Sequence, residues 1–421
     1  MPQRLVFLIF VVASAAVQAR DLTLVEAERL LAERSRELIA ARRAVESAGA
    51  MRAIAAVRPN PTLSLNTLSI SSNPGTGPGP LNQKRVDTVL RIDQPFERGN
   101  KRELRMDAAE GLERAARGDS LDVLRTQLAQ LRGAYYDLKQ AEEKVTVLAE
   151  TAQLFSRTLS AAQSRLKAGD LAAAEVAKVQ VDYERAQNDA RASQAELARA
   201  RITLAYLIGE DRAADELHAA DPWPGRERPD PAAVERAIAQ AADTRPDVIA
   251  AKARVAAAEK LRDLAKSQQT RDITLGAQYD HFPGAIPSNS IGFGISLPLF
   301  TGNDFSGDIQ RAEVDRYAAL DALDRARAIA GNDIRRAASD LAASSDRVER
   351  YDSTLLDAAQ RTAQAVEFAF QRGATSVLEV LDARRTLRAV RLEALAARTE
   401  YAKALAAWRA SLTTAEMPGE K

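Results

Sequence analysis

Apolar residues recur every three or four positions over four long stretches of the chain, a period typical of amphipathic α-helices. The four predicted helices cover about residues 102–166, 171–208, 308–371 and 376–412. At 1.5 Å per residue, the first and third would each be about 100 Å long. Two shorter helical patterns precede them in the two halves of the chain, at residues 24–57 and at residues 232–266, where Pro246 interrupts the pattern.

Short runs of alternating apolar and polar residues lie between the helical stretches. The clearest is residues 290–297, where apolar side chains alternate with serine and glycine. The four predicted strands cover about residues 62–71, 86–93, 273–281 and 290–297. Each pair of strands flanks a loop, residues 72–85 or 283–289, in which proline and glycine exclude regular structure. The pattern therefore predicts two β-hairpins.

The order of elements is the same in both halves: helix, β-hairpin, long helix, helix. A glycine breaks the helical pattern at matching places, Gly169 in the first half and Gly373 in the second. This arrangement indicates an internal duplication. The predicted segments are a first repeat at 20–220, a linker at 221–231, a second repeat at 232–413 and a tail at 414–421.

The first 19 residues have the pattern of a secretory signal peptide. Arg4 precedes an apolar run, and the small residues Val17 and Ala19 mark a cleavage site after Ala19. An uncleaved membrane anchor is the alternative, but the run is shorter than the roughly 20 apolar residues that span a bilayer. We therefore expect export. The chain has no cysteine, so an N-terminal lipid would have no acceptor.

Composition excludes several classes of function. The chain has 58 acidic and 59 basic residues, whereas nucleic-acid-binding proteins normally have a basic excess. With no cysteine and two lone histidines, His218 and His281, neither thiol chemistry nor a Cys/His zinc site is available. Phosphate-binding loops of the GxxxxGK[ST] kind and GxSxG nucleophile motifs do not occur. We expect no enzyme activity and no cofactor.

Each predicted strand has one apolar face and one small or polar face, as a transmembrane β-strand requires. Four strands cannot close a barrel, and lipid does not tolerate open sheet edges. Three copies of the chain would supply twelve strands and a ring of long helices. The alternative is a periplasmic helical protein in which the two hairpins are minor additions.

Three motifs resemble the TolC-type outer membrane factors. They are RPNP at 58–61, QPFERGNKR at 94–102, and Gly373 followed by VLEVLDA at 377–383. The second motif resembles the CzcC-like heavy-metal efflux branch, which usually has a glycine pair before Lys-Arg. Here the second glycine is replaced by Asn100, and asparagine also tolerates the left-handed conformation, so we expect the turn to be kept.

The resemblance implies a homotrimer with a twelve-stranded β-barrel in the outer membrane, continued by an α-helical barrel in the periplasm. Its partners would be a periplasmic adaptor protein and an inner-membrane RND pump, and transport through it would be passive. The CzcC-like motif favours heavy-metal cations as cargo, with drugs and secreted polypeptides as the alternatives. A periplasmic adaptor or scaffold, which uses its helical hairpins for coiled-coil contacts, is the alternative of another class.

Two groups of residues are candidates for function. Glu379 and Asp382 are three apart, so they share one face of a helix, and the resemblance places them in an acidic ring at the tunnel entrance. Such a ring would favour cations. The simpler interpretation is a solvated helix face in a chain with 28% charged residues. The predicted periplasmic hairpin tips are Gly169, Asp170, Gly373 and Ala374.

Overall fold

The computed structural model describes residues 20–68, 86–282 and 288–413. The predicted signal segment at residues 1–19, the loop at 72–85 and the tail at 414–421 lie outside these ranges. The described chain forms two compact units. The unit that we call the hairpin unit comprises residues 20–39, 123–238 and 332–413, and the strand unit comprises the described residues of 40–122 and 239–331. Each unit therefore combines parts of both predicted repeats.

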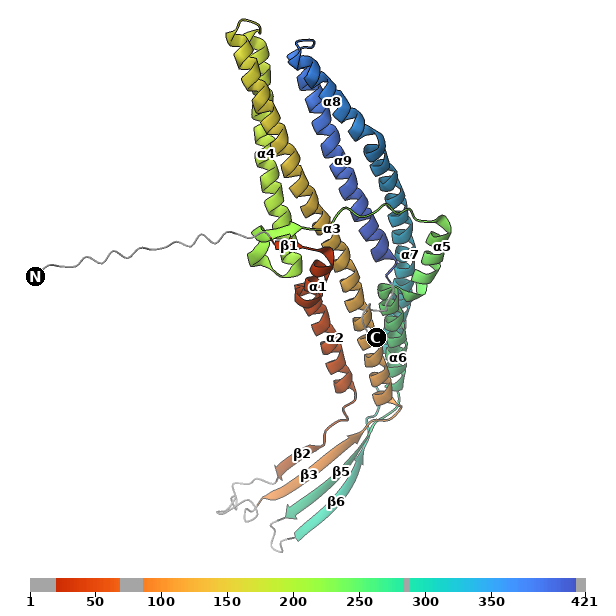
Figure 1. Ribbon diagram of the computed structural model, residues 1–421. Coiled ribbons are helices and arrows are strands. Elements are labelled where there is room, and N and C mark those ends of the chain that lie inside the picture. The colour runs from red at the N-terminus through yellow and green to blue at the C-terminus, as the bar shows by residue number, and fades with distance from the viewer. Residues whose placement is uncertain (1–19, 69–85, 283–287, 414–421) are drawn as a thin grey trace, which may run out of the picture. The chain divides into compact units, whose positions relative to one another are not determined.

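The strand unit contains one antiparallel four-stranded sheet (Figure 1). Its strands, in spatial order, are β2 (Thr62–Leu68), β3 (Asp87–Phe96), β5 (Ile273–Phe282) and β6 (Ser288–Ser296). The register aligns Leu65, Leu90, Tyr279 and Ile291 in one row across the sheet. Because side chains alternate between faces, the neighbouring residues of each strand lie on the other face. The sheet therefore has one apolar face, and β2 and β6 form its two edges.

The opposite face of the sheet is polar. The Arg91 guanidinium donates to the Asp93 carboxylate at 2.7–3.0 Å and to the Gln278 amide oxygen at 2.9 Å. A Cβ atom at Gly276 would clash with Arg91 Nη2. Glycine at this position therefore leaves the space in which the Arg91 side chain crosses to the neighbouring strand.

A shorter helix precedes each pair of sheet strands in the sequence. Helix α2 (Arg36–Ala55) precedes β2, and α6 (Pro246–Ser267) precedes β5. The turn between β3 and the following long helix contains Gly99 and Asn100, whose φ angles of 71° and 56° are both left-handed. The prediction that Asn100 preserves this turn is confirmed.

Two predicted helices are divided in the structure. The pattern at residues 24–57 is two helices, α1 (Leu24–Arg34) and α2, because Ser35 ends the first with an extended ψ of 128° and accepts a hydrogen bond from the Leu38 N–H. The pattern at 232–266 is α5 (Pro231–Thr244) and α6, which Arg245 separates as the predicted interruption at Pro246 requires.

The hairpin unit contains two long helical hairpins (Figure 1). The first is formed by α4 (Ala173–Ile208) and the part of α3 (Lys101–Lys167) from residue 123 onward, and the second by α8 (Leu356–Gln371) and α9 (Val377–Ser411). With 67 residues, α3 is about 100 Å long. None of the described helices has both the length and the apolar composition needed to cross a membrane.

The prediction of an uninterrupted helix at 308–371 is wrong in one respect. Helix α7 (Ser306–Arg350) is joined to α8 by one π-helical turn, Tyr351–Leu355. The Tyr351 hydroxyl donates to the Glu393 carboxylate at 3.1 Å, and Asp352 forms an ion pair with Arg398 at 2.7 Å, so this turn is bonded to α9. A hydrophobic period of three to four residues does not reveal such a local change of winding.

A small parallel sheet in the hairpin unit was not predicted. Its strands are β1 (Arg20–Leu22) and β4 (Leu217–Ala219), and a 3₁₀ helix, η2 (Asp211–Glu216), precedes β4. The buried hydroxyl of Tyr135 on α3 donates to the Leu22 carbonyl at 2.9 Å and accepts the Asp221 N–H at 3.0 Å. This tyrosine therefore joins both ends of the small sheet to the long helix.

A buried carboxylate lies beside this sheet. Glu142 Oε1 is 2.9 Å from His218 Nδ1, and Oε2 accepts the Ala219 N–H at 3.3 Å. Burial raises the pKa of the Glu142 carboxyl, and the neighbouring His218 acts in the opposite direction. The protonated form is thus favoured in the folded chain relative to the unfolded chain.

A raised pKa in the folded state means that stability falls as the pH rises above the unfolded value, because the folded state binds more protons. We expect Glu142→Gln, which cannot ionise, to gain stability relative to the wild type as the pH increases from about 4 to 7. Urea denaturation of the purified protein at each pH measures this difference. The exposed Glu235→Gln is the control, and an equal pH dependence for both variants would contradict the prediction.

Candidate functional site

The two helical hairpins turn with the same backbone geometry. Gly169 ends α3 and Gly373 ends α8, and their φ angles of 84° and 75° are left-handed. In each turn the residue after the glycine, Asp170 or Ala374, donates its N–H to the carbonyl five positions earlier at 2.9 Å. These bonds satisfy helix carbonyls that would otherwise have no partner. The four residues predicted as tips therefore form two equivalent turns.

One of the two candidate acids takes part in starting helix α9. Ser376 is the N-cap, and its hydroxyl oxygen accepts the Glu379 N–H at 3.3 Å. The Thr375 hydroxyl in turn donates to the Glu379 carboxylate. A serine followed three residues later by glutamate is the capping-box pattern, which stabilises a helix N-terminus. Glu379 thus has a structural role in addition to any role at a tunnel entrance.

Asp382 has no comparable structural role. Its side chain is exposed, and it has no hydrogen bond or ion pair with other residues that the structure describes. Asp382 and Glu379 both line one groove between α8 and α9, with a volume of about 590 Å³. Leu355, Val366 and Leu378 make much of the groove wall apolar. The spacing of three thus places the two carboxylates in the same groove, as predicted from a shared helix face.

The opposite side of α9 packs against the first hairpin. Val377 and Leu381 are buried in one cluster with Phe155, Leu159 and Val179 of α3 and α4. Helix α9 therefore has two functions in the fold. One face joins the two hairpins, and the other exposes the acidic pair.

Four arginines of α9 extend this contact, and sequence analysis did not identify them. Arg384 binds Glu367, Thr158 and the Leu154 carbonyl. Arg385 pairs with Asp182, Arg388 with Asp189, and Arg391 with Glu150. Arg384, Arg388 and Arg391 are four and three residues apart, a spacing that indicates one helix face. That spacing was the available sequence signal, but it does not identify partners about 200 residues away.

Among these ion pairs, Arg385 and Asp182 differ most in the exposure of their side chains. The Asp182 side chain is 6% exposed, whereas that of Arg385 is 54% exposed. Two Arg385–Asp182 hydrogen bonds of 2.6 and 2.8 Å satisfy the buried carboxylate. Loss of the arginine would therefore leave a buried negative charge without its partner.

The acidic pair belongs to the second hairpin only. Counting from the tip glycines, Glu175 occupies the position of Glu379, but Lys178 occupies the position of Asp382. The N-cap residue of helix α4 is Ala172, which has no side-chain oxygen to cap the helix. Among the residues that the structure describes, there is no group of three histidines or carboxylates arranged to hold a metal ion.

Comparison with known proteins identifies one family. The family described as "Outer membrane efflux protein" matches residues 28–210 and 237–414. The "Cobalt-zinc-cadmium resistance protein CzcC" of Cupriavidus metallidurans is 28% identical over 381 residues, which cover 90% of this chain and 86% of that protein.

Solved structures show the same fold. The outer-membrane channel OprN superposes with a TM-score of 0.75 at 20% identity, covering 92% of this chain and 89% of OprN. The Campylobacter jejuni CmeC outer membrane channel superposes with a TM-score of 0.78 at 14% identity, covering 92% and 85% of the two chains.

We expect Arg385→Ala to destabilise the hairpin unit by about 1–3 kcal/mol, because it leaves the Asp182 carboxylate buried and unpaired. The midpoint of urea denaturation measures the effect. Adding Asp182→Ala should recover much of the loss, since both partners are then removed. The control is Arg361→Ala, whose exposed ion pair with Asp357 should contribute less than about 1 kcal/mol. Equal effects of Arg385→Ala and Arg361→Ala would contradict the prediction.

Proposed function

The chain belongs to the outer membrane efflux protein family, and from this premise we propose that it is the outer membrane channel of a tripartite efflux system. In this role it conducts cargo passively from a periplasmic adaptor and an inner-membrane RND pump to the outside. The chain catalyses no reaction, because the partner pump supplies the energy for transport.

The two-sided sheet is the observation that supports this proposal most strongly. Its apolar face exposes large side chains, among them Ile291, Ile295 and Phe293, which is 86% exposed. Such a face is expected to contact lipid, while the polar face around Arg91 and Gln278 would line an aqueous channel. The predicted export of the chain after Ala19 is consistent with this location.

The sheet edges support a trimer. In the described chain β2 and β6 each pair with one strand only, and unpaired edges are not stable in hydrocarbon. Pairing β6 of one copy with β2 of the next would satisfy both edges. Three copies then close a twelve-stranded barrel, and the long helices continue it as a periplasmic tunnel. The turns at Gly169 and Gly373 would form the end that meets the adaptor.

We propose divalent heavy-metal cations as the cargo. The supporting observations are the likeness to a cobalt-zinc-cadmium resistance protein and the acidic pair in the second hairpin. Three copies of Glu379 and Asp382 around one axis would concentrate cations at the tunnel entrance. The carboxylates would act as a charged ring through which ions pass, without a resident metal site.

Cell fractionation and a deletion strain test the proposed function. We expect the protein in the outer membrane fraction as a heat-modifiable trimer. Deletion of the gene should increase sensitivity to zinc, cobalt or cadmium, and the wild-type gene should restore resistance. Sensitivity to drugs alone would contradict the metal cargo, and recovery of a monomer from the soluble periplasm would contradict the channel.

The acidic ring is tested separately in planar lipid bilayers. We expect the double variant Glu379→Gln with Asp382→Asn to lower the cation selectivity of the conductance severalfold and to weaken block by multivalent cations. Glutamine and asparagine keep the side-chain size, so the Thr375 and Ser376 contacts at the helix start are disturbed little. The control is Glu175→Gln at the equivalent position of the first hairpin. Unchanged selectivity in the double variant would contradict the gate.

A further inference from the structure

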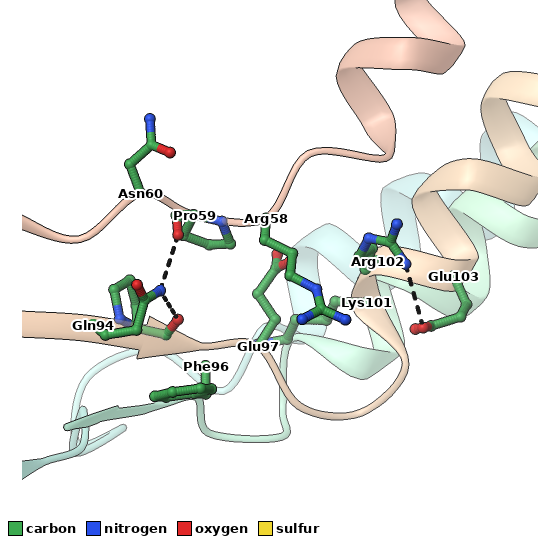
Figure 2. Close-up of a pocket in the computed structure, with 10 residues that line it drawn as sticks. Arg58, Pro59, Asn60, Gln94, Phe96, Glu97, Lys101, Arg102 and Glu103 are labelled. Atoms are coloured by element: carbon green, nitrogen blue, oxygen red, sulfur yellow. Dashed lines mark hydrogen bonds and ion pairs between the residues drawn. The ribbon is translucent and has the colours of Figure 1, made fainter.

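A pocket of about 640 Å³ lies in the strand unit, where the helices meet the sheet (Figure 2). Its walls are the segment at 58–60 after α2, the end of β3 at 94–96, and Glu97 together with the first three residues of α3, 101–103. The Gln94 amide donates to the carbonyls of Pro59 at 3.0 Å and Pro95 at 2.9 Å. The bond to Pro59 joins the first two walls, and the bond to Pro95 holds the Gln94 amide in place within the second wall.

Three cationic side chains line this pocket, and they are not fully satisfied by the described part of the chain. Lys101 is 5% exposed and donates to the Thr270 carbonyl and the Asp272 carboxylate, at 2.9 and 2.8 Å. An ammonium group has three donors, so one has no acceptor among the described residues. Arg58 has no hydrogen bond or ion pair there, and Figure 2 shows it extending toward Lys101 and Arg102.

The third cation is partly free as well. Arg102 uses Nε to donate to the Ala56 carbonyl at 2.7 Å, which leaves the two terminal nitrogens of its guanidinium directed elsewhere. The nearest carboxylate is that of Glu103, 4.0 Å from Nη1. Arg58, Lys101 and Arg102 thus offer several unused donors to an anion, and arginine is especially suited to phosphate.

The two acidic residues of the pocket differ in whether a cationic group of a ligand could bind them. The Glu97 carboxylate is bound by Arg105 at 3.1 Å, and this pair neutralises it. The Glu103 side chain is 63% exposed, and its closest cation is the distant Arg102. The pocket therefore presents unused cationic donors beside one exposed carboxylate, which Arg102 contacts only at the long distance of 4.0 Å. This arrangement suits a zwitterionic ligand, with a phosphate and an ammonium group.

The position of the pocket indicates where such a ligand would come from. Thr62 at the start of β2 pairs with Asp93 near the end of β3, so the pocket lies at the helical end of the sheet. Half-exposed Phe96 gives the pocket an apolar border. If the sheet spans the outer membrane, as the proposed function states, this level is that of the headgroups in the periplasmic leaflet. Aromatic and basic residues are typical of that interface.

We propose that this pocket binds the phosphoethanolamine headgroup of a membrane phospholipid. Arg58, together with Lys101 and Arg102, holds the phosphate, and Glu103 accepts the ammonium group. A choline headgroup has no N–H to donate to Glu103, and a glycerol headgroup has no positive charge, so both bind more weakly. The bound lipid fixes the level of the helix–strand junction in the membrane.

Native mass spectrometry of the full chain, purified in detergent, tests the proposal with short-chain phospholipids. We expect the wild type to bind dihexanoyl-phosphatidylethanolamine more tightly than the phosphatidylcholine and phosphatidylglycerol analogues. Arg58→Gln should lower the affinity for the ethanolamine lipid at least fivefold, and Arg58→Lys should retain part of it. Glu103→Gln should remove the preference for ethanolamine over glycerol. The control is Arg98→Gln, which removes the same charge just outside the pocket lining and should bind like the wild type.

Four results would overturn the proposal. Equal affinities of Arg58→Gln and Arg98→Gln would show a non-specific charge effect, and competition by inorganic phosphate at the lipid's own affinity would show a site for free anions. The wild type could also form an oligomer that contains no lipid. If Arg58→Gln weakens that oligomer, a second copy of the chain fills the pocket. A wild type that conducts ions in bilayers but retains no ethanolamine lipid overturns this inference alone, whereas a wild type that does not conduct contradicts the proposed function.

Discussion

A backbone N–H or C=O group that is left unpaired in hydrocarbon costs several kcal/mol, and in the proposed membrane barrel the four-stranded sheet would have to satisfy this constraint on both of its edges. Within one chain β3 and β5 are fully paired, but β2 and β6 are not. The apolar face around Ile291 and Phe293 has no covering layer in the described chain either. In the proposed barrel, lipid would cover this face and strands of neighbouring copies would pair with these edges.

The two helical hairpins are held together with few large apolar residues. Buried alanines and small clusters such as the one around Val377 and Leu381 supply the contact, and the arginines of α9 extend it with ion pairs. The exposed ion pairs contribute little each, whereas Arg385 compensates the buried Asp182. The face of α9 that remains exposes Glu379 and Asp382, so packing of one face determines where the acidic pair lies.

Periodicity predicted the long helices and the strands because it is a local property of the chain: a period near 3.6 or of two residues is visible within any short window. The capping box at Ser376 and Glu379 is also local, and its S-x-x-E pattern could have been recognised from sequence. The division at Ser35 and the π turn at Tyr351 do not interrupt the apolar pattern, so periodicity did not detect them. The strands β1 and β4 are too short to show any period.

The sequence by itself determined the duplicated order of elements, the two-faced strands, the left-handed turn at Asn100 and the shared helix face of Glu379 and Asp382. These features depend on residues close together in the chain. Only the tertiary structure decided which partners Arg384 and Arg385 find, that Tyr135 joins β1 and β4 to α3, and that residues near 58, 94 and 101 enclose one pocket. Each of these contacts joins at least two segments that are distant in sequence, and no local pattern specifies which distant segments meet.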